Sequence, residues 1–289
     1  MTNTINHQSS TGENGRGAGR HFAAYRAFHQ QGFVPIFVDD HFDSKTLVEA
    51  CVAAGCRGIE YTLRRRDAHT MIPWIREHYP ELYLLVGSTL DDDRIVARMK
   101  KRHPQLLTLA EIDAMNVDGF VSMIGWSEES IRRYAPNRIV VPSAWTVNDA
   151  FFQVKAGAHF AKLLGPEIDL VKRCRMQAAF DYCPIMVTGG MTPERIPATI
   201  EAGAAMVGAG FDLILKGCPA DTGVEKAAAA VKTYLQATRQ ARERVYPELT
   251  RAADADDAGW LAALPHYHPF DNNGLLNTRD EQTKRVCHA

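Results

Sequence analysis

Short apolar runs alternate with longer amphipathic stretches along this chain from residue 33 onward. The short runs are rich in β-branched and aromatic residues, as buried strands are, whereas the stretches between them have helical periodicity. Because strands that alternate strictly with helices pair in parallel, the pattern predicts β–α crossover units. The expected strands are 33–38, 57–63, 82–88, 118–123, 138–143, 159–164, 184–188 and 205–209, and the clearest helices between them are 45–54, 91–102, 146–156, 167–181 and 193–202.

The number of these units favours one fold class. Eight strand and helix units predict an α/β fold of the (β/α)8 or TIM-barrel type, which commonly uses about 250 residues as one domain. An open dinucleotide-binding sheet lacks support, because Gly208-Ala209-Gly210 resembles the start of a GxGxxG fingerprint but follows the last strand. We expect the barrel to span 21–246 and to end with an Ala-rich helix over 222–244.

The two ends of the chain differ from this core. Residues 1–20 are rich in Asn, Thr, Ser and Gly, so we expect a flexible leader that is neither a signal peptide nor a membrane span. Residues 247–289 form a C-terminal tail that carries His266 and His268. These histidines could bind a metal, but a tail that packs over the barrel or lies on its surface is the simpler expectation.

Composition limits the partners that the protein can have. The 289 residues are 46% hydrophobic and carry 33 basic against 34 acidic side chains, for a net charge of -1. This balance gives no general attraction to nucleic acid or to an anionic membrane, so we expect small-molecule partners. The six cysteines include no CxxC pair, which indicates free thiols in the reducing cytoplasm. Cys51 and Cys56 have no His or acidic residue at the spacing of a metal site.

A lone cation, Lys162, stands inside the apolar run 159–164. An ammonium group in a buried strand is costly unless it is paired or has lost its proton. A neutral lysine is a nucleophile that forms Schiff bases with carbonyl compounds, so the position suggests covalent chemistry on a keto substrate. The alternative is a lysine at a strand end whose ammonium group reaches water.

Three polar side chains share one face of the expected strand 57–63 and its end. With a period of two, Glu60, Thr62 and Arg64 point the same way, and in a barrel this face lines the interior. One interpretation makes Glu60 an acid/base group and Arg64 a bidentate clamp for a carboxylate. The other is a structural ion pair between Glu60 and Arg64.

Two further strand ends carry groups that could hold an anion. Thr89 could donate a hydroxyl hydrogen bond to an anionic group or, alternatively, cap a helix that starts near Asp91. The motif Thr188-Gly189-Gly190 precedes a helix that Thr192-Pro193-Glu194 would open. In barrels the loops after the last two strands commonly bind phosphate, and glycines there let backbone N–H groups approach an anion.

Together these segments resemble the 2-keto-3-deoxy-6-phosphogluconate / 4-hydroxy-2-oxoglutarate aldolase family over about residues 25–235. Members of this family are class I barrel aldolases that cleave 2-keto acids to pyruvate and an aldehyde. The family's Glu-x-Thr-Leu-Arg run is similar to residues 60–64, its Gly-Ala-Gly-Thr to Val86-Gly87-Ser88-Thr89, its Pro-containing segment to 141–146 with Pro142, its Schiff-base lysine to Lys162, and its Thr-Gly-Gly loop to 188–190.

The chain departs from the family on the side that receives the aldehyde. Gly210-Phe211 stands where family members carry Gly-Ser, whose hydroxyl contacts the substrate phosphate, and Ser122-Met123 replaces Ser-Pro. The residues after Lys162 also depart from the family's aromatic residue and proline. The resemblance therefore implies a retained pyruvate half and an altered aldehyde half, where the backbone N–H groups of Gly189, Gly190 and Gly210 can still hold an anion.

The resemblance implies a class I catalytic cycle that needs no metal or other cofactor. Lys162 forms the Schiff base, Glu60 moves protons, and Arg64 and Thr89 hold the substrate carboxylate. The implied substrate is a 2-keto-3-deoxy sugar acid, with or without a 6-phosphate, or 4-hydroxy-2-oxoglutarate, and the implied assembly is a homotrimer. Two alternatives stay open: a phosphate-binding barrel isomerase or epimerase with Glu60 as base and Lys162 as electrophile, and a degenerate relative that only binds a keto acid.

Overall fold

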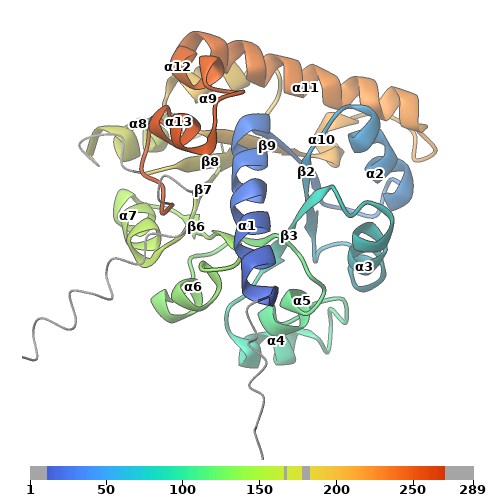
Figure 1. Cartoon of the computed structure of the whole chain (residues 1–289). Helices are drawn as coiled ribbons and strands as arrows, with labels where there is room; N and C mark the ends of the chain where they lie inside the picture. The colour runs from blue at the N-terminus through green and yellow to red at the C-terminus, as the bar shows by residue number, and fades with distance from the viewer. Residues whose placement is uncertain (1–11, 166–167, 178–182, 271–289) are drawn as a thin grey trace, which may run out of the picture.

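The strands of this protein form one parallel sheet that closes on itself (Figure 1). A computed structural model describes residues 12–165, 168–177 and 183–270. In the sheet, β5 (Ile139–Val141) and β6 (Ser143–Ala144) stand at the two ends of the strand order, although only Pro142 separates them in the chain. They are two halves of one strand, interrupted where proline has no N–H to donate. The sheet is therefore a barrel of eight strand positions, and the expected fold class is confirmed.

Each strand position lies within two residues of its predicted range. All strand pairs are parallel, as the alternation of strands and helices predicts. The remaining strands are β1 (Phe33–Phe37), β2 (Gly58–Thr62), β3 (Tyr83–Thr89), β4 (Gly119–Ser122), β7 (Ala161–Leu164), β8 (Ile185–Thr188) and β9 (Met206–Gly210).

Several of the helices that surround the barrel, among them α2, α4 and α7, begin at side-chain caps that the sequence supplies. Asp43 caps the first of them, and Thr146 and Asp149 form a capping box on α7. Within the described ranges, no helix combines the length and the apolar character needed to cross a membrane. The surrounding helices are α2 (Ser44–Ala53), α3 (Ala68–His78), α4 (Asp93–Met99), α5 (Leu109–Asp113), α6 (Glu128–Tyr134), α7 (Val147–Ala156), α8 (Ile168–Gln177), α9 (Ile196–Glu201), α10 (Phe211–Ile214) and α11 (Val224–Val245).

The helix α1 (Gly12–Gln31) closes the amino end of the barrel and lies across the strands in Figure 1. Its Arg20 forms an ion pair at 2.7 Å with Asp118, which directly precedes β4. Its Phe28 is fully buried, and its ring lies where a Cβ on Gly58 at the start of β2 would stand. The helix thus takes in residues 12–20 of the expected leader and anchors their end to the barrel; residues 1–11 lie outside the described part.

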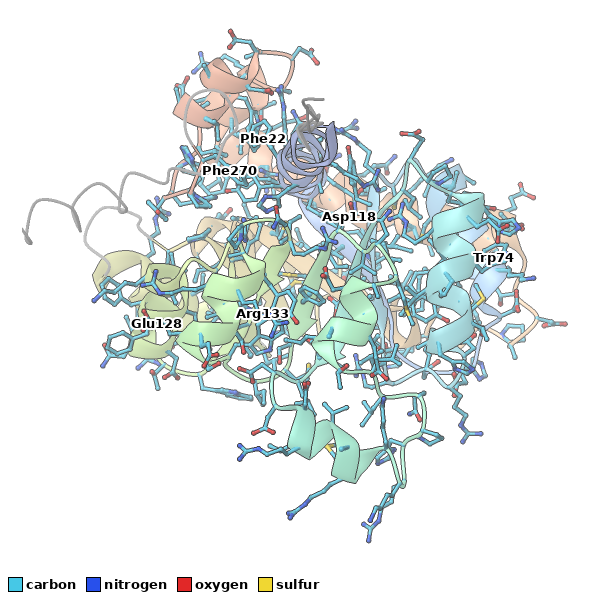
Figure 2. All side chains as sticks on the ribbon, turned by 60° about the horizontal axis from the view of Figure 1, so that its bottom comes forward. Phe22, Trp74, Asp118, Glu128, Arg133 and Phe270 are labelled. Carbon is cyan, nitrogen blue, oxygen red and sulfur yellow. The ribbon has the colours of Figure 1, made fainter. Side chains whose placement is uncertain are left out.

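The C-terminal extension packs on α1 through α12 (Pro247–Arg251), α13 (Asp257–Ala262) and the segment after them. Trp260 is fully buried, and the Phe270 ring lies 5.1 Å from that of Phe22 on α1 (Figure 2). His266 contacts His29 of α1 at 2.7 Å between their Nε2 atoms. The buried rings of Trp260 and Phe270 show that the described part of the tail packs against α1. Among the described residues no group of three or more His, Cys, Asp or Glu side chains could hold a metal ion.

Two buried histidines, His21 of α1 and His159 just before β7, meet and fix each other's protonation. Nδ1 of His159 accepts a hydrogen bond from the backbone N–H of Val140 at 3.2 Å, so its proton is on Nε2. That Nε2–H then donates to Nε2 of His21 at 3.0 Å. Burial, and secondarily the charge of Arg138, lowers the pKa of His21 to about 4. Both rings are therefore neutral, since a proton on either would set two donors against each other.

Acidification should destabilise the fold through these histidines. Below pH 6.5, the ordinary histidine pKa, His21 binds a proton in the unfolded chain, whereas in the folded state it stays neutral down to about pH 4. Each such histidine lowers the free energy of unfolding by roughly 1.4 kcal/mol per pH unit in that window. Urea unfolding at about pH 7 and pH 5 should show a larger loss in wild type than in His21→Gln. An equal loss in the two proteins would remove His21 from this explanation.

Candidate active site

Lys162 lies in β7 with its amine inside the barrel. Its side chain is only 3% exposed, so the alternative in which the ammonium group reaches water is wrong. Its Nζ lies 3.7 Å from Oε1 of Glu60 and 3.9 Å from Sδ of Met123. Its backbone N–H donates to the carbonyl of Pro142 at 2.8 Å, so the proline that interrupts the neighbouring strand still anchors this one.

Glu60 lies in β2 and reaches Lys162 from the opposite side of the interior. Its side chain is 1% exposed, and Oε2 has no hydrogen-bond partner among the described residues. Its ion-pair partner is Lys162, so the expected structural pair with Arg64 is not the one that forms. A buried carboxylate oxygen without a partner is costly unless a bound molecule or water supplies the missing hydrogen bond. Glu60 is therefore placed to exchange a proton with a molecule held at Lys162.

The surroundings of Lys162 lower the pKa of its amine. Burial lowers the pKa of the Lys162 amine below its ordinary value, the nearby Glu60 carboxylate opposes this effect, and the charge of Arg64 adds to it. Burial is the largest of these causes, because transfer from water penalises the charged form. The amine thus loses its proton more easily than an exposed lysine does.

The position of Glu60 depends on a glycine in the next strand. Gly87 lies opposite Thr62 in the register of β2 and β3. A Cβ on Gly87 would clash with Oε1 of Glu60 and stand 2.9 Å from Cγ2 of Thr62. The absence of a side chain at residue 87 therefore makes room for the carboxylate beside Lys162.

Two arginines follow β2 and play different parts. The strand ends at Thr62, so Arg64 stands beyond the predicted interior face, where it is exposed while its charge still acts on Lys162. Arg65 is 3% exposed and donates to the backbone carbonyls of Asp39 and Phe42. It ties the loop after β1 to the end of β2. The sequence gives no signal for the role of Arg65, because neighbouring arginines do not reveal which of them is buried.

The end of β3 is a bulge that turns Thr89 into the barrel wall. The pairing of β3 with β4 shifts between Val86 and Thr89, and Ser88 adopts a left-handed conformation with φ of 61°. The Thr89 hydroxyl donates to the carbonyl of Val121 at 2.9 Å, and Asp92, not Thr89, caps the next helix. The Ser88 hydroxyl is buried without a partner among the described residues, a feature that sequence reasoning did not single out.

The glycine loop after β8 has the backbone freedom that an anion site needs. Gly189 and Gly190 are exposed and have positive φ of 86° and 61°, which other residues rarely adopt. Thr188 is buried, and its carbonyl accepts from Gly165 at 2.8 Å. The expectation that residues 192–194 open the next helix is wrong, because a turn intervenes and α9 starts at Ile196. The glycines therefore lie in a loop and not at a helix end.

The residues at the end of β9 are the ones least suited to bind a phosphate. Phe211 is 1% exposed, and its ring packs edge-on against Phe37 at 5.0 Å, so it points into the wall and not toward the glycine loop. Asp212 is exposed, and its Oδ1 lies against Gly210, within the space that a Cβ there would need. An acidic group thus stands beside Gly210, one of the three glycines whose N–H groups are expected to hold an anion.

The chain was compared with known proteins. No family model matches its sequence. The 2-dehydro-3-deoxy-6-phosphogalactonate aldolase of Escherichia coli (strain K12) is 27% identical over 197 residues, which make up 66% of this chain and 88% of that protein.

Solved structures share the fold. A native KDPGal structure has a TM-score of 0.57 at 23% identity and covers 73% of this chain and 96% of its own. The 2-keto-3-deoxy-6-phosphogluconate aldolase of Zymomonas mobilis ZM4 with 3-phosphoglycerate has a TM-score of 0.56 at 22% identity and covers 74% of this chain and 94% of its own. Thiamine phosphate pyrophosphorylase from Pyrococcus furiosus has a TM-score of 0.55 at 12% identity and covers 74% of this chain and 98% of its own. At these identities the structural likeness establishes the barrel fold alone.

Adding a methyl group at residue 87 should destabilise the protein. We expect Gly87→Ala to lower the free energy of unfolding by about 1–3 kcal/mol, because it overpacks a buried site and displaces Glu60. Gly19→Ala is the matched control, since Gly19 is exposed within α1, where alanine is a good helix former, and has no atom within 4 Å of its added Cβ. Urea unfolding of the two variants tests this, and equal stabilities would mean that Glu60 does not need the space.

Proposed function

We propose that this chain, which is similar in sequence to a 2-dehydro-3-deoxy-6-phosphogalactonate aldolase and in fold to 2-keto-3-deoxy-6-phosphogluconate aldolases, is a pyruvate-forming class I aldolase that works through a Schiff base on Lys162. One observation carries the proposal: a lysine amine buried inside the barrel, with a lowered pKa, 3.7 Å from the carboxylate of Glu60. A nucleophilic amine and a proton-transfer group at this separation are the two parts that imine chemistry needs.

The reaction begins with attack of neutral Lys162 on the C2 carbonyl of a 2-keto acid. A carbinolamine forms, and Glu60, directly or through a water, delivers the proton that lets its hydroxyl leave as water. The resulting protonated imine accepts electrons. Because the site already lowers the pKa of the amine, the nucleophilic form is present at neutral pH in a larger fraction than an exposed lysine would provide.

Cleavage then uses the same two residues in reverse roles. Glu60 takes the proton of the C4 hydroxyl, the C3–C4 bond breaks, and its electron pair moves to the imine nitrogen and leaves an enamine. The aldehyde departs, C3 of the enamine is protonated, and hydrolysis returns pyruvate and free Lys162. The unpartnered Oε2 of Glu60 can make the hydrogen bond that this step requires.

Arg64 is the proposed binding group for the substrate carboxylate. It is exposed after β2, and its charge acts on Lys162, so it stands near the reacting amine with donors available. Thr89 would contribute only if its hydroxyl turned from Val121, to which it donates now. Pro142 would line the pyruvate side, because its carbonyl is hydrogen-bonded to Lys162.

The distal end of the substrate is proposed to reach the loops after β8 and β9. Thr188, Gly189, Gly190 and Gly210 stand there, and the two loop glycines are exposed. Asp212 beside Gly210 would repel a phosphate dianion. We therefore favour an unphosphorylated 2-keto-3-deoxy sugar acid or 4-hydroxy-2-oxoglutarate over a 6-phosphate.

The oligomeric state and the cellular location of the protein are proposed from the same family resemblance. A homotrimer would cover apolar side chains that this chain exposes: Trp145 is 60% exposed and Phe152 on α7 is 59% exposed. The five cysteines in the described part of the chain are free thiols, which fits a reducing cytoplasm.

Borohydride trapping with pyruvate tests the proposed function. We expect wild type to gain a covalent adduct on Lys162 and Lys162→Ala to gain none and to lose at least about a hundredfold in aldol cleavage, given the size of covalent catalysis. Glu60→Gln should still form the adduct but cleave about 10² to 10⁴ times more slowly. Adduct without cleavage in wild type would indicate a keto-acid-binding relative, and no adduct would indicate the isomerase alternative.

Removing the acidic group at the distal end should improve the use of phosphorylated substrates. We expect Asp212→Asn to raise kcat/KM for 2-keto-3-deoxy-6-phosphogluconate about tenfold, since one nearby like charge is worth roughly 1–3 kcal/mol near a surface. The value for the unphosphorylated sugar acid should stay within about twofold. Phe211→Ser is a poor test because it would empty a buried site against Phe37. An unchanged preference in Asp212→Asn would contradict the proposed specificity.

A further inference from the structure

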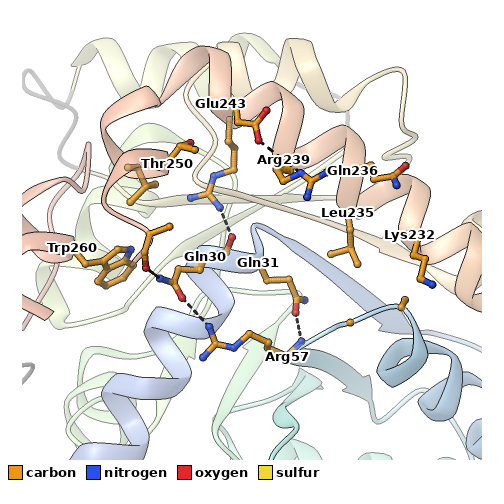
Figure 3. A pocket seen from close by; sticks show the side chains of 15 residues that line it. Gln30, Gln31, Arg57, Lys232, Leu235, Gln236, Arg239, Glu243, Thr250 and Trp260 are labelled. Atoms are coloured by element: carbon orange, nitrogen blue, oxygen red, sulfur yellow. Dashed lines mark hydrogen bonds and ion pairs between the residues drawn. The ribbon is translucent and has the colours of Figure 1, made fainter. Parts of the chain in front are cut away.

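A cavity of about 510 Å³ lies at the amino end of the barrel. It is lined by the last turn of α1, the segment that leads into β2, one face of α11 and the start of the C-terminal extension (Figure 3). The loops proposed to meet substrate follow the carboxyl ends of the strands, so the cavity is at the other end of the barrel. Its volume is in the range of small-molecule sites.

The charge of the cavity is strongly one-sided. Four of its lining residues are cationic, Arg57, Lys232, Arg239 and Arg242, against a single acidic one, Glu243. The closest atoms of Glu243 and Arg239 are 3.8 Å apart, so the acid is already engaged with one of the cations. This excess of positive charge stands out on a chain whose net charge is -1. Converging cations in a concave, partly apolar site attract an anion.

Arg57 is held in a fixed position at the edge of the cavity. Its Nη1 donates to Oε1 of Gln30 at 2.8 Å, and its backbone N–H donates to Oε1 of Gln31 at 2.6 Å. Both glutamines belong to the last turn of α1, so Arg57 is anchored at two points while its side chain stays exposed. A guanidinium fixed in this way keeps its other N–H donors ready for a phosphate-type oxygen at little entropic cost.

The helix α11 supplies a matching row of polar groups. Lys232, Gln236, Arg239 and Glu243 recur at spacings of four and three residues, so they lie on one face of the helix. Figure 3 shows this row across the cavity from Arg57. Two separate elements therefore present donors to the same space.

Arg242 forms the floor of the cavity and is 7% exposed. It donates to the carbonyls of His29 and Gln30 at the end of α1, whose helix dipole is negative there. Its Nε has no partner among the described residues, and burial lowers its pKa to about 10, which leaves it charged at neutral pH. The part of the chain that the structure describes offers Arg242 no carboxylate, so an anion in the cavity would complete its charge balance.

We propose that this cavity binds a small organic phosphate, whose phosphate group sits between Arg57 and the Arg239 face of α11 above Arg242. The remaining volume would hold the organic part of the ligand beside Leu235. Such a ligand bridges α1, α11 and the extension at Thr250, so its binding stabilises the docked extension and not the reacting groups at Lys162.

Inorganic phosphate is the probe, used with the full-length protein. Isothermal titration calorimetry at constant ionic strength should show one saturable site, and phosphate should raise Tm. Arg57→Ala and Arg239→Ala should each weaken binding about tenfold or more, as expected for the loss of a charge-assisted hydrogen bond. Arg244→Ala is the matched control, because Arg244 is exposed on the same helix but does not line the cavity; it should bind as wild type does.

Phosphate could instead bind at the proposed substrate site, and the variants distinguish the two locations. Phosphate held at the mouth of the barrel would be weakened by Arg64→Ala and not by Arg57→Ala, which would overturn the proposal. It would equally be overturned if no saturable binding occurs up to about 20 mM, or if Arg57→Ala and Arg239→Ala bind like Arg244→Ala. The two cavity variants and the Arg244→Ala control should all keep the pyruvate adduct on Lys162, so this test and that of the aldolase function can fail independently.

Discussion

The interior of this barrel depends on one buried pair of opposite charges, the amine of Lys162 and the carboxylate of Glu60. Taking two such groups out of water costs more than their attraction returns unless the geometry is good and the remaining polar atoms are satisfied. Here the atoms are 3.7 Å apart and one carboxylate oxygen lacks a partner, so the pair is incompletely satisfied. A molecule bound beside Lys162 would supply the missing hydrogen bond, as the proposed keto-acid substrate would. The cost of the buried pair is offset by the stable barrel around it.

The scaffold meets this demand with precise local geometry around the pair. Gly87 leaves the space that the Glu60 carboxylate fills, and Arg65 fixes the loop after β1 against the end of β2. The carbonyl of Pro142 holds β7 in register, so the Lys162 backbone is fixed even where the neighbouring strand is interrupted. The position of the amine is thus determined by backbone contacts and by the absence of a side chain.

The two ends of the barrel differ in what they contain: packed, buried groups at the amino end and exposed polar groups at the carboxyl end. At the amino end, α1 and the C-terminal extension cover the strands with buried aromatic rings and with neutral histidines such as His21 and His159. At the carboxyl end, exposed groups such as Arg64 and Gly190 follow the strands. This division is usual for barrels, in which loops at the carboxyl ends can change without loss of the core. The altered distal side, with Asp212 beside Gly210, is a change of that kind.

The sequence by itself determined the strands, the barrel and the two charged residues that meet inside it. A cation in an apolar run and an acid on an interior face can be predicted because the periodicity of burial is a local property of the sequence. In the structure Lys162 and Glu60 form an ion pair. The partner of Glu60, the burial of Arg65 beside exposed Arg64, and the turn of Phe211 into the wall were decided only by tertiary structure. Each depends on contacts between residues far apart in the chain, and no local pattern encodes which of two neighbouring side chains the packing will enclose.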